Sequence, residues 1–438
     1  MEMQWNKLLT SQRLKTNNGN GYDIRTEYYR DYDRIVFSAS FRRLARKTQV
    51  HPLSFNDHIH NRLTHSIEVS SVGRSLGLAV GLEIQDKLPK DITAVDFASI
   101  IQAACVAHDI GNPPFGHAGE YAIRQWFTEN EELLDNSLTD AQRSDLMSFE
   151  GNAQGFRVVS QLESRYKDGG LRLTFATLGA LIKYPWQSDH NLVVKKGKFN
   201  IFQSEVEVFN EVVKVLGLLQ MKDGQYARHP LAYLMEAADD ICYKILDIED
   251  ALELNLLRIS DVIPIFERLA NENNIQDLGD NYSTRRRIVN FRAKAINNLI
   301  QEVVKVFSAY YSEIMNGSFE GDLISRISDD CQKGIAEIRN LTNKHVFSNR
   351  RKVELEVGAY ASIEIILNAF ISAVNDKIDS KGNKLSFKSQ RILDLMEDDL
   401  PESCNSPYEY YMSITDFVSG MTDNYATFLA KQISGSAK

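Results

Sequence analysis

The stretch that decides the fold is Thr93–His117, TAVDFASIIQAACVAHDIGNPPFGH. Its apolar residues recur at helical spacing as far as Ala107, and Thr93 is a suitable N-terminal cap, so we expect a buried helix there. The residues expected along one side of this helix are Val95, Ala98, Ile101 and Cys105. The two prolines in Gly111–Pro114 end helical hydrogen bonding. His108 and Asp109 are therefore fixed side by side at a helix terminus.

This adjacent imidazole and carboxylate form a candidate metal site. A neutral nitrogen and an anionic oxygen are ligands that one hard or borderline divalent ion accepts together. The pair alone is a weak signal, because a His-Asp dipeptide arises by chance and most histidines are structural. Further candidates are His65, in a helical stretch from Thr64 towards Val80, and Asp239, inside a helix opened by Pro230. Spacing alone does not show that the four side chains meet.

The rest of the chain predicts an all-α protein. It has 438 residues, of which 43% are hydrophobic and 25% charged, as in folded globular proteins. One large helical domain or two closely packed ones is expected from this length. Apolar residues recur at three and four spacing over long stretches, and one short segment, Leu192–Phe202, is predicted to form a small β-hairpin.

Two polar segments interrupt the helical pattern. We interpret Glu129–Ser148 as a surface loop or insertion and Asn271–Ser283 as a boundary. The predicted division is a core over residues 1–270 and a C-terminal helical region over residues 271–438 packed on it. In the second part, Arg286–Ser312 and Val353–Val374 are expected to be amphipathic helices that serve packing or an oligomer surface.

The composition of the chain also indicates where the protein is located and whether a membrane is a partner. The most apolar stretch, Ile363–Val374, is interrupted by Glu364 and Asn368 and is too short to cross a bilayer, and Met1–Thr10 does not resemble a signal peptide. We therefore expect a cytoplasmic protein without a membrane partner. Its four cysteines have no CxxC spacing, which predicts reduced and mostly buried thiols; they are Cys105, Cys242, Cys331 and Cys404.

The net charge of −9 argues against a surface built throughout for nucleic acid. Three local basic clusters remain: Arg42, Arg43, Arg46 and Lys47; Arg285–Arg287; and Arg350–Lys352. We interpret the last two as solvated helix faces.

Several longer motifs resemble those of one enzyme family. His65, His108-Asp109 and Asp239 follow the order H…HD…D that names the HD phosphohydrolases. The segments that are similar to the dGTPase branch of that superfamily are Phe37–Val50 with FRRL and KTQV, Arg62–Ser66 (RLTHS), His108–His117 (HDIGNPPFGH) and Glu236–Asp240 (EAADD). They span Tyr28–Asp250, a little over half of the chain.

This resemblance implies an HD-domain helical core and a reaction. Water would attack the α-phosphorus of a deoxynucleoside triphosphate and release deoxynucleoside and intact triphosphate. His65, His108, Asp109 and Asp239 would hold one divalent ion, with Mn²⁺ or Mg²⁺ favoured and Fe²⁺, Ni²⁺ or Zn²⁺ possible.

A general acid for the leaving 5′-oxygen is implied next to the metal. His117 is the candidate, with Glu120 as the carboxylate that orients it, since the two share a face if a helix starts at Gly116. Some relatives carry another histidine where this chain has Asn112. An amide can hydrogen bond phosphate oxygens but cannot shuttle a proton, which puts a second acid or base in doubt.

The helix after Pro230 carries an apolar seam, which consists of Leu234, Ala238, Ile241, Ile245 and Ile248. A second stripe, Asp239, Tyr243 and Asp247, runs along one side over ~12 Å of helix. The resemblance places Tyr243 and Asp247 against a deoxyribose, with the ring excluding a 2′-hydroxyl and the carboxylate accepting the 3′-hydroxyl, which Gln49 also contacts.

Phosphate contacts are expected from cations near the metal. The candidates are Arg62, Lys183 and Lys198, and Tyr184 belongs to a segment that resembles the family's triphosphate lining. The resemblance further implies a homo-oligomer, commonly a hexamer, and an activating second nucleotide or single-stranded DNA as a partner.

Two other functions remain open at this stage. One is an HD hydrolase of another phosphorylated nucleotide, which the metal set alone would fit. The other is a nucleotide sensor or nucleic-acid-binding protein without turnover. Base preference and metal identity cannot be predicted from these residues.

Overall fold

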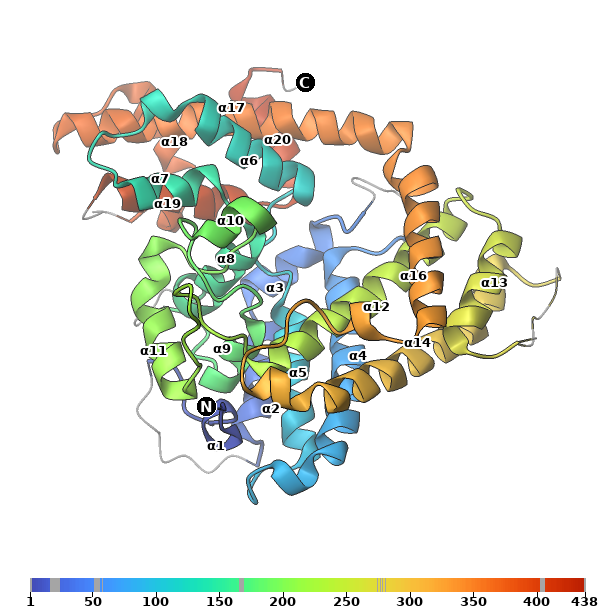
Figure 1. Ribbon diagram of the computed structural model, residues 1–438. Helices are drawn as coiled ribbons and strands as arrows, with labels where there is room; N and C mark the ends of the chain where they lie inside the picture. The colour runs from blue at the N-terminus through green and yellow to red at the C-terminus, as the bar shows by residue number, and fades with distance from the viewer. Residues whose placement is uncertain are drawn as a thin grey trace.

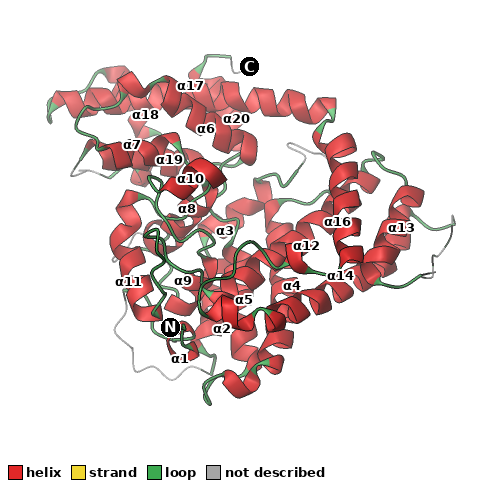
Figure 2. Cartoon of the chain, viewed as in Figure 1, coloured by secondary structure: helices red, strands yellow, loops and turns green. Residues whose placement is uncertain are grey.

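A computed structural model describes residues 2–15, 24–50, 56, 58–164, 169–273, 275, 277, 279, 281–401 and 406–436. These residues form twenty α-helices and contain no β-strand, which confirms the all-α prediction (Figure 2). In the first half of the chain the helices are α1 (Trp5–Leu8), α2 (Glu27–Val36), α3 (Ala39–Arg43), α4 (Arg62–Glu83), α5 (Ala94–Ala107), α6 (His117–Glu129), α7 (Asp140–Met147), α8 (Gly151–Arg157), α9 (Phe175–Leu181), α10 (Asn191–Lys196) and α11 (Val206–Leu216). The remaining helices are α12 (Pro230–Glu253), α13 (Ile259–Ala270), α14 (Thr284–Ala309), α15 (Tyr311–Met315), α16 (Asp329–Thr342), α17 (Arg350–Ser380), α18 (Phe387–Asp394), α19 (Pro407–Gly420) and α20 (Asp423–Ile433).

Helix α5 forms where the sequence predicts it. Thr93 caps its N-terminus by accepting from the Asp96 backbone N–H, and the Asp96 side chain accepts from the Thr93 N–H in return. Ala98, Ile101 and Cys105 are buried as expected, but Val95 is 50% exposed because it lies in the first turn, on the outer face. The helix ends at Ala107 and delivers His108 to the protein interior.

Helices α4 and α5 pack unusually closely through small residues. Gly73, Gly77 and Gly81 lie along one side of α4, facing α5. A Cβ atom on Gly77 would lie 2.7 Å from the Cα of Ala98, so there is no room for a side chain at this position. This close approach brings the start of α4, which carries His65, beside the end of α5, which carries His108.

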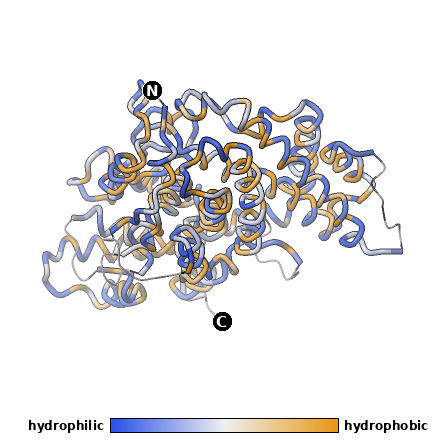
Figure 3. Tube along the Cα trace, turned by 90° about the horizontal axis from the view of Figure 1, so that it is seen from below, coloured by the Kyte–Doolittle hydropathy of each residue, from blue (hydrophilic) through white to orange (hydrophobic). Residues whose placement is uncertain are grey.

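Two clusters of buried apolar residues stabilise the chain. The first joins α4, α5, α9 and α12 with α13, α14 and α16. The second joins α6 and α7 with α17, α18, α19 and α20, which lie together at the top of Figure 1. Figure 3 shows hydrophobic and hydrophilic residues alternating along the helices, as expected for amphipathic helices that each bury one face.

These clusters do not follow the order of the sequence. Helices α13 and α14 flank the predicted boundary at Asn271–Ser283, and both contribute to the first cluster. Part of that boundary segment lies outside the described residues. The division into residues 1–270 and 271–438 stays a prediction.

The predicted hairpin at Leu192–Phe202 is wrong. Residues Asn191–Lys196 form α10, whose N-terminus is capped by the His190 side chain. The helix ends at Gly197, which has a left-handed backbone with φ of 65°. The Lys-Lys-Gly sequence taken as a hairpin turn is therefore a helix C-terminus, because glycine adopts positive φ in both settings.

The polar segment Glu129–Ser148 is not only a loop. It contains α7, which begins after a reciprocal cap between Thr139 and Gln142. Cys105, Cys242 and Cys331 are free and buried, as predicted, whereas Cys404 lies outside the described residues.

One helix in the described part of the chain, Lys352–Ser380, is long and apolar enough to cross a membrane by length and composition alone. Its apolar residues Ile363, Ile366, Leu367 and Phe370 are fully buried in the second cluster. Such burial is that of a core helix in a folded protein. The expected amphipathic helices at Arg286–Ser312 and Val353–Val374 correspond to α14 and α17.

The packing of α4 on α5 predicts opposite effects for two glycine substitutions. Gly77→Ala should lower the free energy of unfolding by about 1–3 kcal/mol, because the added methyl group meets the backbone of Ala98. Gly358→Ala, at an exposed position of α17, is the matched control, since a methyl group added there would meet no atom within 4 Å. It should be neutral or stabilising by up to about 1 kcal/mol through helix propensity. Urea unfolding monitored by circular dichroism measures both, and equal stability of the two variants would contradict the packing argument.

Candidate active site

The four predicted metal ligands converge in the interior. His65, His108 and Asp109 each direct one ligand atom into a group in which these atoms lie within 4.8 Å of one another. Asp239 completes the group, because its Oδ1 lies 3.0 Å from His65 Nε2 and 3.5 Å from His108 Nε2. Helices α4, α5 and α12 thus supply two imidazoles and two carboxylates to one point.

The second nitrogen of His108 is already engaged. Its Nδ1 lies 2.7 Å from the Cys105 carbonyl oxygen, one turn back along α5. A carbonyl oxygen only accepts, so Nδ1 donates its proton there and Nε2 is the nitrogen that would give its lone pair to a metal ion. This Nε2 is buried without a hydrogen-bond partner. The donor set therefore fits a cation.

The electrostatics of the group point the same way. Burial alone would lower the pKa of His108, but the carboxylates of Asp109 and Asp239 outweigh it and raise this pKa to about 9. Burial would raise the pKa of Asp239, yet His108 and His65 hold it well below its usual range. The two carboxylates thus stabilise positive charge placed between them, whether on the imidazole or on a bound cation.

Two further predicted residues hold Asp109 in place. Arg62, buried in the first turn of α4, forms an ion pair of 2.8 Å between its guanidinium and Asp109 Oδ2. The Asn112 amide donates to Asp109 Oδ1. The amide that replaces a histidine of some relatives therefore orients a ligand carboxylate here, and its contact with phosphate stays a prediction.

His117 and Glu120 form the pair that the sequence predicts. Gly116, with φ of 61°, precedes α6, and His117 Nδ1 lies 3.0 Å from Glu120 Oε2. The His117 side chain is 70% exposed, so its Nε2 is accessible, whereas Glu120 is buried.

Glu120 is held by two cations that surround it. Arg124 donates to Glu120 Oε1 at 2.7 Å, and Lys198 Nζ lies 3.3 Å from the same oxygen. Burial would raise the pKa of Glu120, but His117, Lys198 and Arg124 hold it well below its usual range. Lys198 also bonds Glu150 at 2.6 Å, which places this predicted phosphate contact beside the acid pair.

The stripe predicted on the helix after Pro230 lies on α12, while the apolar seam of that helix is buried. Asp247 is buried, and burial together with the neighbouring Asp250 raises its pKa well above the usual value. Tyr243, which lies between Asp239 and Asp247 in the sequence, has a half-buried side chain. Among the described residues, the buried Oε1 of Gln49 has no hydrogen-bond partner, so no bond from this atom joins Gln49 to the stripe.

Lys183 contacts α12 close to Asp239. Its Nζ is 3.1 Å from Glu236 Oε1, one turn before Asp239 on α12, and 5.6 Å from the Tyr184 ring centre. Burial would lower the pKa of Lys183, but Glu236 raises it, so the ammonium stays charged. The structure thus places Lys183 and Tyr184 near the metal-binding group, and their triphosphate contacts stay predictions.

Comparison with known proteins agrees with this geometry. The HD domain family matches residues 62–145. A "Deoxyguanosinetriphosphate triphosphohydrolase-like protein" of Pseudomonas aeruginosa (strain LESB58) is 45% identical over 99% of both chains, and one of Synechocystis sp. is 39% identical over 99% of both. A "Deoxyguanosinetriphosphate triphosphohydrolase" of Yersinia pestis (strain Pestoides F) is 31% identical over 92% of this chain and 93% of its own. The chain belongs to the deoxyguanosinetriphosphate triphosphohydrolase-like family of HD-domain proteins.

In this member of the dGTPase-like family, one histidine near the site was missed by the sequence analysis. His60 Nδ1 lies 2.6 Å from Asp250 on α12, and its Nε2 lies 3.4 Å from Glu68 on α4. It thereby ties the segment before α4 to the helix that carries Asp247. Its position two residues before the RLTHS motif was the only signal in the sequence.

The basic clusters differ in their surroundings. Lys47 is buried rather than part of an exposed patch, because its Nζ donates to two carbonyl oxygens, those of Asn112 and Ser419. Arg285 pairs with Glu253, and Arg350 pairs with Glu354. Arg285 and Arg350 are exposed, as interpreted, whereas the Arg287 and Lys352 side chains are only 13% exposed in pairs with Asp277 and Glu356. The side chain of Arg351 lies outside the described residues.

The His60 contacts predict a specific pH dependence of stability. Burial would lower the pKa of His60, but hydrogen bonds to Asp250 and Glu68 outweigh it and raise the pKa from 6.5 to about 10. The stabilisation is therefore complete below about pH 6.5 and is lost as the pH rises through about 10. His60→Gln should lower the free energy of unfolding by on the order of 2 kcal/mol at pH 7, and the gap to wild type should close by pH 10.5.

The measurement is urea unfolding at several pH values. His58→Gln, two residues earlier and exposed, is the control and should follow the wild-type profile. A gap between His60→Gln and wild type that does not change with pH would contradict the charged-histidine interpretation.

Proposed function

We propose that this protein hydrolyses deoxynucleoside triphosphates, dGTP or several dNTPs, to deoxynucleoside and inorganic triphosphate. The observation that carries the proposal is the convergence of His65, His108, Asp109 and Asp239 on one point, at one end of the Asp239–Tyr243–Asp247 stripe. Metal ligands and a candidate sugar site on one helix suit a nucleotide whose phosphates reach the metal.

One divalent ion per site, with Mn²⁺ or Mg²⁺ favoured, would be held by these four residues. When bound, it would polarise the α-phosphoryl group and lower the pKa of the attacking water. The ion pair between Arg62 and Asp109 Oδ2 holds the Asp109 carboxylate in one orientation. Lys183 and Lys198 supply positive charge for the triphosphate.

The leaving 5′-oxygen requires a proton, and His117 is placed to donate it. Glu120 accepts from Nδ1 and fixes the ring, which leaves Nε2 as the donor towards substrate. Because His117, Lys198 and Arg124 hold the pKa of Glu120 well below its usual range, the carboxylate remains an acceptor at neutral pH.

In this proposal, residues of α12 and of the segment before α4 select a deoxyribose over a ribose. The Tyr243 ring would leave no room for a 2′-hydroxyl, while Asp247 and Gln49 would bind the 3′-hydroxyl. Loss of polar pairing and steric exclusion both disfavour a ribonucleotide. The proposal also includes a cytoplasmic homo-oligomer, a hexamer as in the family it resembles, with an activating dNTP or single-stranded DNA and without a membrane partner.

Product analysis tests the reaction. Wild-type protein with Mn²⁺ should convert dNTPs to deoxynucleoside and triphosphate in equal amounts and leave GTP largely intact. Asp109→Ala should lower turnover by about a thousandfold or more, because it removes a ligand and leaves Arg62 unpaired. Asp261→Ala, at an exposed position in α13, is the control and should retain wild-type turnover.

Anion-exchange and reversed-phase chromatography of the products separate the alternatives. Release of pyrophosphate or a nucleoside monophosphate would show an HD hydrolase of another specificity. Equal and negligible turnover of wild type and Asp109→Ala with both Mn²⁺ and Mg²⁺ would instead favour a binding protein.

A further inference from the structure

The turn between α19 and α20 contacts two parts of the site that the sequence separates widely. Asp423, the first residue of α20, is 3% exposed. Its Oδ2 accepts from the Thr48 backbone N–H at 3.0 Å, and its Oδ1 accepts from the Phe115 backbone N–H at 2.9 Å. Thr48 precedes Gln49, and Phe115 lies two residues before His117.

A second contact reinforces this arrangement. The Lys47 ammonium donates to the Asn112 and Ser419 carbonyl oxygens, both at 2.6 Å. Lys47 thus links the HD-motif turn to Ser419, and the adjacent Thr48 is bonded to Asp423 in the same part of the C-terminal region.

The backbone that Asp423 holds is strained. Phe115 and Gly116 have consecutive positive φ angles of 64° and 61°. Phenylalanine has a Cβ atom and adopts this conformation only at a cost of ~1 kcal/mol or more, so surrounding contacts must impose it. The Phe115 N–H bond to Asp423 is one such contact, and it fixes the residue that sets the direction of the chain into α6 and His117.

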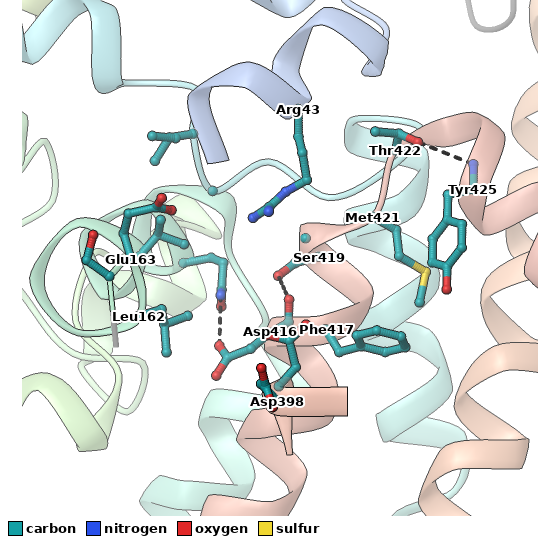
Figure 4. Close-up of a pocket in the computed structure, with 17 residues that line it drawn as sticks. Arg43, Leu162, Glu163, Asp398, Asp416, Phe417, Ser419, Met421, Thr422 and Tyr425 are labelled. Atoms are coloured by element: carbon teal, nitrogen blue, oxygen red, sulfur yellow. Dashed lines mark hydrogen bonds between the residues drawn. The ribbon is translucent and has the colours of Figure 1, made fainter. Parts of the chain in front are cut away.

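A cavity of about 480 Å³ lies next to the α19–α20 turn. It is lined by Ile110 and Gly111 of the HD motif and by residues 419–422. Figure 4 shows Ser419, Met421 and Thr422 along one side of this cavity, with Arg43 directed into it. The polar contacts of Lys47 and Asp423 join the HD motif to this part of the chain, and Phe115 and Met421 are buried in the same apolar cluster.

We propose that Asp423 is a positioning residue for the reaction, which sets Gln49 against the sugar and His117 against the leaving oxygen through one buried carboxylate. The proposal rests on the proposed function. A carboxylate can accept from two N–H donors at once, one on each oxygen, which an amide cannot do without turning its NH₂ group towards one donor.

Substitutions that remove one or both of the Asp423 hydrogen bonds distinguish a positioning role from a role in the stability of α20 alone. Asp423→Asn loses one of the two bonds, and Asp423→Ala loses both. Leu429→Ala, in the same helix and buried in the second cluster, loosens α20 without touching either bond. All three are compared at a temperature at which circular dichroism shows each to be folded.

Two readouts are measured with Mn²⁺-loaded protein. The first is kcat for dNTP turnover, which should fall about tenfold or more in Asp423→Asn and further in Asp423→Ala, because small misplacement of a catalytic group is costly. The second is the affinity ratio of a deoxynucleoside α,β-imidotriphosphate to its ribose counterpart by calorimetry, which should fall about fivefold or more. Leu429→Ala should retain both values near those of wild type.

The outcomes are distinct. Equal losses in Asp423→Asn and Leu429→Ala, or wild-type values in Asp423→Ala, would overturn the positioning role. Absence of turnover in wild type, with a sugar preference that Asp423→Asn still reduces, would overturn the proposed reaction and support the positioning role. Absence of nucleotide binding by wild type would overturn both.

Discussion

A methyl group on Gly77 would lie 2.7 Å from the backbone of Ala98, and the site depends on this lack of space. Close packing of α4 on α5 brings His65 and His108 together, with ring centres 5.4 Å apart. With bulkier residues at the contact the helix axes would separate by an ångström or more, and two ligands on different helices would no longer reach one ion. The packing of two helices is therefore a condition of the chemistry.

Charge balance is the second constraint. Two carboxylates in a buried site are unfavourable unless positive charge compensates them. Arg62 compensates Asp109, and His65 and His108 compensate Asp239. The same logic applies at Glu120, where Arg124 and Lys198 keep a buried carboxylate ionised beside His117. The site thus consists of two anionic centres, one suited to a metal ion and one to an imidazole.

Much of this could be predicted from the sequence, for identifiable reasons. The cap at Thr93, the proline that opens a helix at Pro230 and the helical spacing after each are local signals, and α5 and α12 form there. The set of four metal ligands was predicted from the resemblance of the motifs. Spacing alone could not join Asp239 to the His108-Asp109 pair, 130 residues earlier in the chain. The hairpin at Leu192–Phe202 failed because a Lys-Lys-Gly turn also ends a helix. The contacts of Lys47 and Asp423 could not be foreseen, since their partners lie up to 375 positions away and are backbone atoms, which leave no trace in side-chain patterns.

The central claim is that four side chains from three helices bind a single cation. Titration of the purified protein with Mn²⁺, followed by electron paramagnetic resonance of the free ion, measures it without any assumption about substrate. The account predicts one tight site per chain, with affinity reduced by about a hundredfold or more in Asp239→Asn and in His65→Ala. Unchanged Mn²⁺ affinity in Asp239→Asn would contradict it.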